Sequence, residues 1–269
     1  MTIPLPDLSA LDLEADPKGC CARLYESDAV RWLLDDRLHP GGDALTLRLA
    51  RLAGVARQQR VLDVACGSGG TVLLLARELG CTAVGVDLGP RALDRARDAA
   101  RRAGLDDRAS FVLGDAEALP LAAASFDVAL SECSLCTFPD KRRAVTEMAR
   151  VVRPGGTIAI ADVTADHEAL PNALRSAAAR VACVADARGA DEYAALLRDA
   201  GCEPLAIEAH DTELRTMADR VEARLRVARM LAPPGDQRDG IREAAALARL
   251  AIDAIARGSL GYALITARA

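Results

Sequence analysis

Aromatic residues and lysine are both scarce in this chain of 269 residues. Phe, Trp and Tyr make up 3% of the residues, and Lys18 and Lys141 are the only lysines. Because hydrophobic residues still amount to 51%, a full core can form, and it must be built mainly from Ala, Val and Leu. Chemistry through a lysine Schiff base has few candidate residues.

The sequence also lacks the features that direct a chain into a membrane or onto nucleic acid. Residues 1–17 carry acids where a signal peptide has basic residues, and no apolar run approaches the length that spans a bilayer. The net charge is -5, and no basic patch interleaved with aromatics occurs. We therefore expect a cytosolic, cytoplasmic protein with no nucleic-acid and no membrane partner, whose cysteines are mostly reduced.

Strands and helices alternate along the middle of the chain, which predicts an α/β fold. Strands are expected at 60–65, 82–87, 109–114, 125–132 and 157–162, with intervening helices at 70–79, 90–103 and 140–151. Strands joined by helices in this way require right-handed crossovers and form a mostly parallel sheet.

The two ends of the chain depart from this alternation. Residues 1–55 are expected to be an N-terminal helical lead-in or lid, with helices at 22–35 and 43–55, and residues 56–269 the main domain with C-terminal helical insertions. The last third predicts helices at 170–185, 191–200, 214–231 and 237–256 and strands at 205–210 and 259–267. An antiparallel C-terminal strand is expected, but the sequence leaves the strand order open.

A turn rich in small residues follows the first predicted strand. Ala65, Gly67 and Gly69 let the backbone approach a bound ligand where the strand passes into a helix. Asp87 ends the next strand, at the edge where open α/β sheets bind ligands, and its carboxylate can accept both hydroxyls of a ribose. A dinucleotide site uses the same geometry, although its preferred spacing is G-x-G-x-x-G, which this turn does not have.

Four motifs in order resemble those of class I S-adenosylmethionine-dependent methyltransferases over about residues 60–162. They are the turn after the first strand, the acid at Asp87, the segment 114–120 and the run 150–157. The resemblance implies a Rossmann-like class I methyltransferase fold with S-adenosylmethionine as cofactor. It places Asp63 and Gly67 at the methionine end, Asp87 at the ribose, and Asp115 and the backbone amide of Ala116 at the adenine. The remaining cofactor-binding residues that it implies are Ala65, Gly69, Leu88 and Glu132.

Two of the eight cysteines stand out by their position. Cys133 and Cys136 follow the fourth predicted strand, on the edge where a reactive methyl group should point. A structural zinc site is not indicated, because there is no second C-x-x-C pair and the three histidines do not cluster with them. Cys66, Cys81 and Cys202 read as small residues that fill a turn or the core.

The segment 131–141 is similar to the stretch S-N-C-x-x-N-L-x-x-D-K of arsenite methyltransferases, with Cys133 on that family's cysteine. The segment 182–201 resembles the region around the family's next cysteine, which Cys183 matches. The resemblance implies that both cysteines bind trivalent arsenic as a metalloid substrate. Arsenic is soft and binds thiolates, and its lone pair can attack the methyl group without a general base, so the protein mainly positions the reactants.

Departures from that family leave the methyl acceptor open. Glu132 replaces an Asn of the family motif and Cys136 replaces another family residue. The candidates for a third thiol ligand are Cys136, Cys20 and Cys21, and the adjacent pair has no clean match in the family. A thiol reductant could accompany a metalloid acceptor. Two alternatives stay open: methylation of C, O or N of a small organic molecule, as in quinone- or sterol-type methyltransferases, and a non-catalytic ligand-binding protein.

Overall fold

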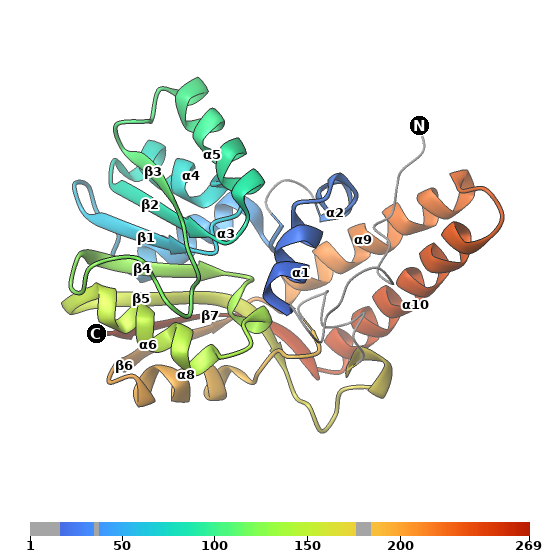
Figure 1. Cartoon of the computed structure of the whole chain (residues 1–269). Helices are drawn as coiled ribbons and strands as arrows, with labels where there is room; N and C mark the ends of the chain where they lie inside the picture. Colours follow the sequence, from blue (N-terminus) through green and yellow to red (C-terminus); the bar gives the residue numbers. More distant parts are fainter. Residues whose placement is uncertain (1–16, 35–37, 176–183) are drawn as a thin grey trace.

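A seven-stranded sheet runs through the centre of the computed structural model, which describes residues 17–34, 38–175 and 184–269, apart from the side chains of residues 17, 20 and 21 (Figure 1). The strand order is β3-β2-β1-β4-β5-β7-β6. The strands are β1 (Arg60–Val64), β2 (Thr82–Asp87), β3 (Ala109–Leu113), β4 (Phe126–Glu132), β5 (Val152–Ala165), β6 (Glu203–Ala209) and β7 (Leu260–Arg268). Because β7 alone runs antiparallel to both of its neighbours, the predicted mostly parallel, Rossmann-like α/β class with an antiparallel C-terminal strand is confirmed.

Helices cover both faces of this sheet. They are α1 (Pro17–Tyr25), α2 (Asp28–Leu34), α3 (Gly42–Leu52), α4 (Gly70–Leu79), α5 (Pro90–Ala103), α6 (Lys141–Val151), α8 (Ala190–Asp199), α9 (Asp211–Leu231) and α10 (Asp236–Ala256), with short 3-10 turns η2 (Leu135–Thr137) and η3 (Asn172–Arg175). Leu49 of α3 and Leu75 of α4 are buried against one face, and Met148 of α6 and Leu197 of α8 against the other. These four helices present an apolar face to the sheet, which is why the Ala-, Val- and Leu-rich sequence can fill the core.

Helices α9 and α10 form a hairpin beside the ligand-binding edge of the sheet, next to α1 and α2 (Figure 1). Leu225 and Ile241 are buried between the two long helices, and Trp32 of α2 packs against them. The Arg224 guanidinium donates hydrogen bonds to the carbonyls of Trp32 (2.8 Å) and Leu33 (3.0 Å), which lie at the end of α2 and have no partner within that helix. The hairpin therefore holds α2 in place near the edge of the sheet.

Several predicted boundaries differ from the structure, and three of the differences have a clear cause. The helix predicted at 22–35 is two helices, because the Ser27 hydroxyl accepts a hydrogen bond from the Val30 amide (3.3 Å) and caps a new helix. The helix predicted at 170–185 is wrong over 170–175, where Pro171 is followed only by the short turn η3, and residues 176–183 lie outside the described residues. Strand β5 extends to Ala165, beyond the predicted 162, because β7 pairs with it along that length.

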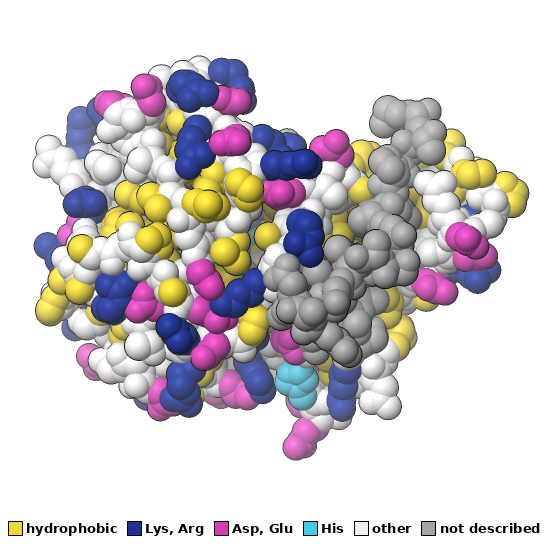
Figure 2. Space-filling model, in the orientation of Figure 1, with side chains coloured by type: hydrophobic (Ala, Val, Ile, Leu, Met, Phe, Trp, Pro, Cys, Tyr) yellow, Lys and Arg dark blue, Asp and Glu magenta, His cyan; other side chains and the backbone are white. Residues whose placement is uncertain are grey.

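The surface carries charges of both signs. On the face shown in Figure 2, Lys and Arg side chains are interspersed with Asp and Glu, and neither sign gathers in one large patch. Within the described ranges, no helix is both long and apolar enough to cross a membrane.

Candidate cofactor and acceptor site

The turn between β1 and α4 has the backbone that its small residues predict. Ala65, Gly67 and Gly69 have positive φ values of 61°, 52° and 78°, the left-handed region that favours glycine. A Cβ atom at Gly69 would lie 2.6 Å from the Phe111 ring, so this position also needs glycine for packing. The turn forms one wall of a pocket at the carboxyl edge of β1, β2 and β4.

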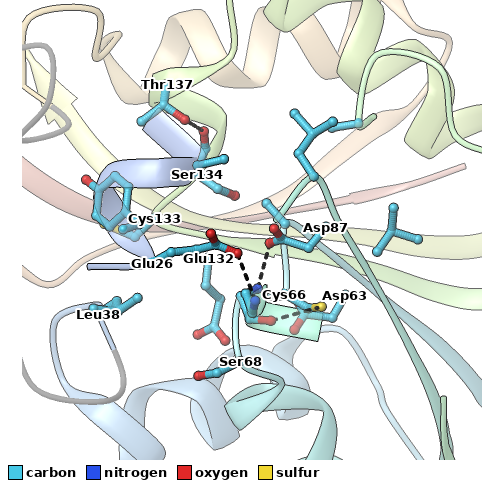
Figure 3. Close-up of a pocket in the computed structure, with 18 of the residues that line it drawn as sticks. Glu26, Leu38, Asp63, Cys66, Ser68, Asp87, Glu132, Cys133, Ser134 and Thr137 are labelled. Carbon is cyan, nitrogen blue, oxygen red and sulfur yellow. Dashed lines mark hydrogen bonds between the residues drawn. The ribbon is translucent and has the colours of Figure 1, made fainter. Parts of the chain in front are cut away.

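Asp87 connects this turn to the next one. Its carboxylate accepts hydrogen bonds of 2.7 Å from the backbone amides of Gly67 and Gly89. Glu26, which accepts a hydrogen bond from the Ala92 amide (2.8 Å), brings a second carboxylate beside it, as Figure 3 shows. Burial, opposed by these amide hydrogen bonds and reinforced by Glu26, raises the pKa of Asp87 above its ordinary value.

Asp115 and Ala116 line the pocket beyond β3, and their predicted contact with the adenine stays a prediction. The Asp115 carboxylate accepts hydrogen bonds from the Glu117 amide (2.9 Å) and from Lys18 Nζ (2.7 Å), and Lys18 also donates to Glu117 (2.6 Å). Although partial burial alone would raise it, the pKa of Asp115 is lowered because Lys18 hydrogen-bonds and pairs with its charge. Leu88 is 39% exposed on the same pocket, an apolar surface suited to the face of a ring.

Glu132 and Asp63 complete the acidic lining at the ends of β4 and β1. Glu132 accepts hydrogen bonds from the hydroxyls of Thr71 (2.6 Å) and Thr46 (3.0 Å). Asp63 is buried, and its burial, together with the nearby charges of Glu132 and Asp87, raises its pKa well above the ordinary value. The raised pKa of Asp63 means that its ionised form is favoured most when a positive charge lies nearby.

The lining fits the predicted cofactor by charge. Five carboxylates face one pocket, from Glu26, Asp63, Asp87, Asp115 and Glu132. S-adenosylmethionine carries an ammonium and a sulfonium group, so its cationic end complements this acidic surface, and the residues present could hold it. The left-handed turn with Gly67 leaves its backbone open, because a Cβ at that position would meet no atom within 4 Å.

A family model described as a methyltransferase domain matches residues 56–201. This chain belongs to that methyltransferase family. The match confirms the expected family. A structural neighbour, a phosphoethanolamine N-methyltransferase 2 from Haemonchus contortus, was solved in complex with S-adenosylmethionine, the cofactor expected from the sequence. That structure has a TM-score of 0.77 at 19% identity and covers 94% of this chain and 59% of its own.

Relatives of this chain carry names that point to different acceptors. The methyltransferase GfsG of Streptomyces halstedii is 37% identical over 64% of this chain and 63% of its own length. The 27-O-demethylrifamycin SV methyltransferase of Amycolatopsis mediterranei is 36% identical, over 61% of each chain. The chain thus spans less than two thirds of these two relatives. An arsenite methyltransferase of Halobacterium salinarum is 30% identical over 78% of this chain and 55% of its own.

A structural neighbour shows that the fold alone does not fix the reaction. The [4+2]-cyclase SpnF has a TM-score of 0.74 at 24% identity and covers 93% of this chain and 95% of its own. Proteins with the same fold can catalyse different reactions, so the acceptor and the reaction must be inferred from the residues of the site.

The two cysteines that follow β4 have different surroundings. Cys133 is partly buried, lines the pocket and has a φ of 51°, an uncommon value for a residue with a side chain. Cys136 is 1% exposed, packs in the core and donates its backbone amide to Asp162 (3.0 Å). The expectation that both sulfurs face the pocket is therefore wrong for Cys136, because the 3-10 turn η2 directs it inward.

The other cysteines divide into core residues and residues that the structure leaves undescribed. Cys81 and Cys202 are buried as core fillers, and Cys66 occupies the space above Gly85, where a Cβ would lie 2.5 Å from its sulfur. Cys183 and the side chains of Cys20 and Cys21 lie outside the described residues, so their predicted roles stay predictions. Within the described part, no three His, Cys, Asp or Glu residues are grouped to hold a metal ion.

Several pocket residues were not found from the sequence. Lys18 and Glu26 come from α1 and the turn after it, and His39 comes from the segment that leads into α3. These residues lie far from the glycine-rich turn in the chain and belong to no spaced motif, so only the tertiary structure brings them to the site.

Proposed function

We propose that this protein transfers a methyl group from S-adenosylmethionine to a small molecule. The observation that carries the proposal is the single pocket in which the left-handed turn, Asp87 and Asp115 meet Glu132 and Cys133. The protein's part is to bind the cationic cofactor with its carboxylates and to hold the acceptor beside the end of β4. The cofactor supplies an electrophilic methyl group. Proximity and orientation account for much of the rate in a transfer of this kind.

A hydroxyl group of an organic molecule is the acceptor that the described pocket supports best. The pocket wall has a buried histidine, His39, next to Thr46 and Glu132. A hydroxyl must lose its proton as it is methylated, and histidine is the side chain that most often accepts such a proton. The similarity to 27-O-demethylrifamycin SV methyltransferase favours the same class.

Trivalent arsenic held by thiolates is the second candidate, and Cys133 is the observation that favours it. Its thiol lies on the pocket wall beside Glu132, and the arsenite methyltransferase of Halobacterium salinarum is similar over 78% of the chain. Cys183, with Cys20 or Cys21, would supply the remaining thiolates, and a thiol reductant would keep them reduced. The burial of Cys136 makes it a poor third ligand.

The experiment that tests the proposal is transfer of a labelled methyl group to a panel of acceptors. The panel contains phenols, aliphatic alcohols, quinols and arsenite with a thiol reductant. Transfer to none of them, by a protein that binds the cofactor, would contradict the proposal. Cys133→Ser should abolish arsenite methylation and leave methylation of hydroxyls nearly unchanged, because serine is a harder and less acidic ligand. Cys202→Ser, at a buried position outside the pocket, is the matched control.

A further inference from the structure

His39 occupies a buried position on the pocket wall just before α3. Its side chain is 9% exposed, and it lines the same pocket as Glu132 and Cys133. The residue before it, Leu38, has a φ of 58° and lines the pocket as well. Because the imidazole is buried, its neighbours show which of the two ring nitrogens carries the hydrogen.

The hydrogen bonds around the ring leave one nitrogen with a lone pair. Nδ1 lies 3.1 Å from the carbonyl oxygen of Pro40, and because a carbonyl only accepts, Nδ1 must carry the hydrogen. In a neutral imidazole, Nε2 is then the acceptor. The hydroxyl of Thr46 lies 3.5 Å from Nε2, but it donates to the carboxylate of Glu132, at 3.0 Å and 3.2 Å to the two oxygens. Among the described residues, no other group donates to Nε2, so its lone pair can accept a hydrogen bond from a ligand in the pocket.

We propose that His39 is the catalytic general base that takes the proton of a hydroxyl acceptor; the proposal rests on methyl transfer to oxygen as the proposed function. In this step the acceptor oxygen forms a bond to the methyl carbon while the carbon–sulfur bond of the cofactor breaks, and the bonding pair stays on sulfur. The hydroxyl proton passes to Nε2, and the imidazolium later returns it to water. No oxidant, reductant or metal enters the balance.

Thr46 and Glu132 fix the surroundings of the ring. Thr46 is 2% exposed and donates its hydroxyl to Glu132, and Glu132 also accepts a hydrogen bond from Thr71 (2.6 Å). The Thr46 hydroxyl is therefore committed to the carboxylate, and the position of His39 beside it does not depend on a bound ligand.

The test uses the full-length protein with His39→Ala and His39→Asn. Asparagine can still donate to the Pro40 carbonyl through its amide nitrogen but has no group at the place of Nε2, so it keeps the local structure if alanine does not fold. His167→Asn is the matched control, because His167 lies outside the cofactor pocket. Rates are measured on a series of phenols and alcohols of increasing acidity, and cofactor affinity is measured by calorimetry.

We expect both His39 variants to lose about 10²- to 10⁴-fold in kcat on weakly acidic hydroxyls, the usual contribution of a general base. The loss should shrink toward phenols that are already ionised, while cofactor affinity and the rate on arsenite, where that acceptor reacts, stay unchanged. Nitrogen NMR of the free protein should show Nε2 of His39 without a proton.

Three results would overturn the assignment of the base. They are wild-type rates in His39→Asn on weakly acidic hydroxyls, an equal loss across the whole acidity series, and a proton on Nε2 in the neutral ring. A wild-type protein that methylates arsenite but no hydroxyl would overturn the acceptor class and the base together. A wild-type protein with no transfer to any acceptor would instead contradict the proposed function.

Discussion

Asp87 is the carboxylate whose surroundings most resemble a site for two hydroxyl groups. Backbone amides of Gly67 and Gly89 fix both of its oxygens, so its orientation does not depend on the ligand. We expect Asp87→Ala to weaken S-adenosylmethionine binding about 10- to 100-fold, since loss of a buried acceptor costs about 1.5–3 kcal/mol. Calorimetry measures the affinity, with Asp94→Ala, an exposed acid of the following helix, as control. Unchanged affinity in a folded Asp87→Ala protein would contradict the assignment of the ribose acid.

We expect Asp63 to lower the stability of the fold and to strengthen cofactor binding. Burial first, then the charges of Glu132 and Asp87, raises its pKa well above the ordinary value. An acid whose pKa is raised in the folded state holds its proton more tightly there than in the unfolded chain, so its ionised form destabilises the fold at higher pH. Asp63→Asn should therefore raise the melting temperature of the cofactor-free protein, by about 2–4 °C per kcal/mol, and weaken cofactor binding. A lower melting temperature without cofactor would contradict this.

At the scale of elements, one lysine of α1 pairs with the two acids that follow β3 beside the pocket. Lys18 pairs with Asp115 at 2.7 Å and with Glu117 at 2.6 Å, across almost 100 positions of sequence. Because α1 also contributes Ala22 and Tyr25 to the lining, this contact holds a wall of the pocket in place.

Removal of the lysine should therefore speed cofactor release. We expect Lys18→Ala to increase the dissociation rate of S-adenosylmethionine several-fold, since each partly exposed ion pair contributes about 0.2–1 kcal/mol. Lys18→Arg should restore most of the effect, and added salt should reduce the difference between wild type and Lys18→Ala. Stopped-flow experiments measure the dissociation rate of the cofactor. Equal rates for wild type and Lys18→Ala at low salt would show that α1 does not retain the cofactor.

Local patterns predicted the elements that carry the cofactor site, and tertiary contacts decided the rest. The strand, the small-residue turn and Asp87 were found because their spacing has a direct chemical reason. The break at Ser27 was missed because the hydrophobic pattern continues through it, and only the cap on α2 ends the preceding helix. Cys136 was assigned to the pocket by its spacing from Cys133, but one 3-10 turn rotates it into the core.

For the whole molecule, the sheet and the helical hairpin position different parts of the pocket. The parallel strands align the ends of β1, β2 and β4, because Val64 pairs with Val86 and Asp63 with Leu130. The hairpin of α9 and α10 holds α2 through Arg224 and carries the exposed side chains of Val227, Met230 and Leu231. The sheet thus fixes the strand ends that line the pocket, whereas Arg31 of α2, which also lines it, belongs to a helix that the hairpin supports.

The charge of the whole pocket makes cofactor binding depend on pH in a defined direction. The pKa values of Asp63 and Asp87 are both raised, by burial first and by neighbouring carboxylates second. Part of the free protein therefore holds protons on these groups at a pH where ordinary carboxylates have none. A cation in the pocket favours the ionised carboxylates, so binding must release protons, and affinity must rise with pH until both groups are ionised in the free protein.

Calorimetry in two buffers of different ionisation enthalpy measures this release. Binding of S-adenosylmethionine should release protons near the raised pKa values, and the number released should fall toward zero at higher pH. Asp63→Asn should release fewer protons than the wild type, because one of the two groups no longer titrates, whereas Asp94→Asn should match the wild type. Proton uptake on binding would contradict the acidic pocket as the recognition site for the cofactor's positive charge, because a cation that enters among carboxylates can only lower their pKa values.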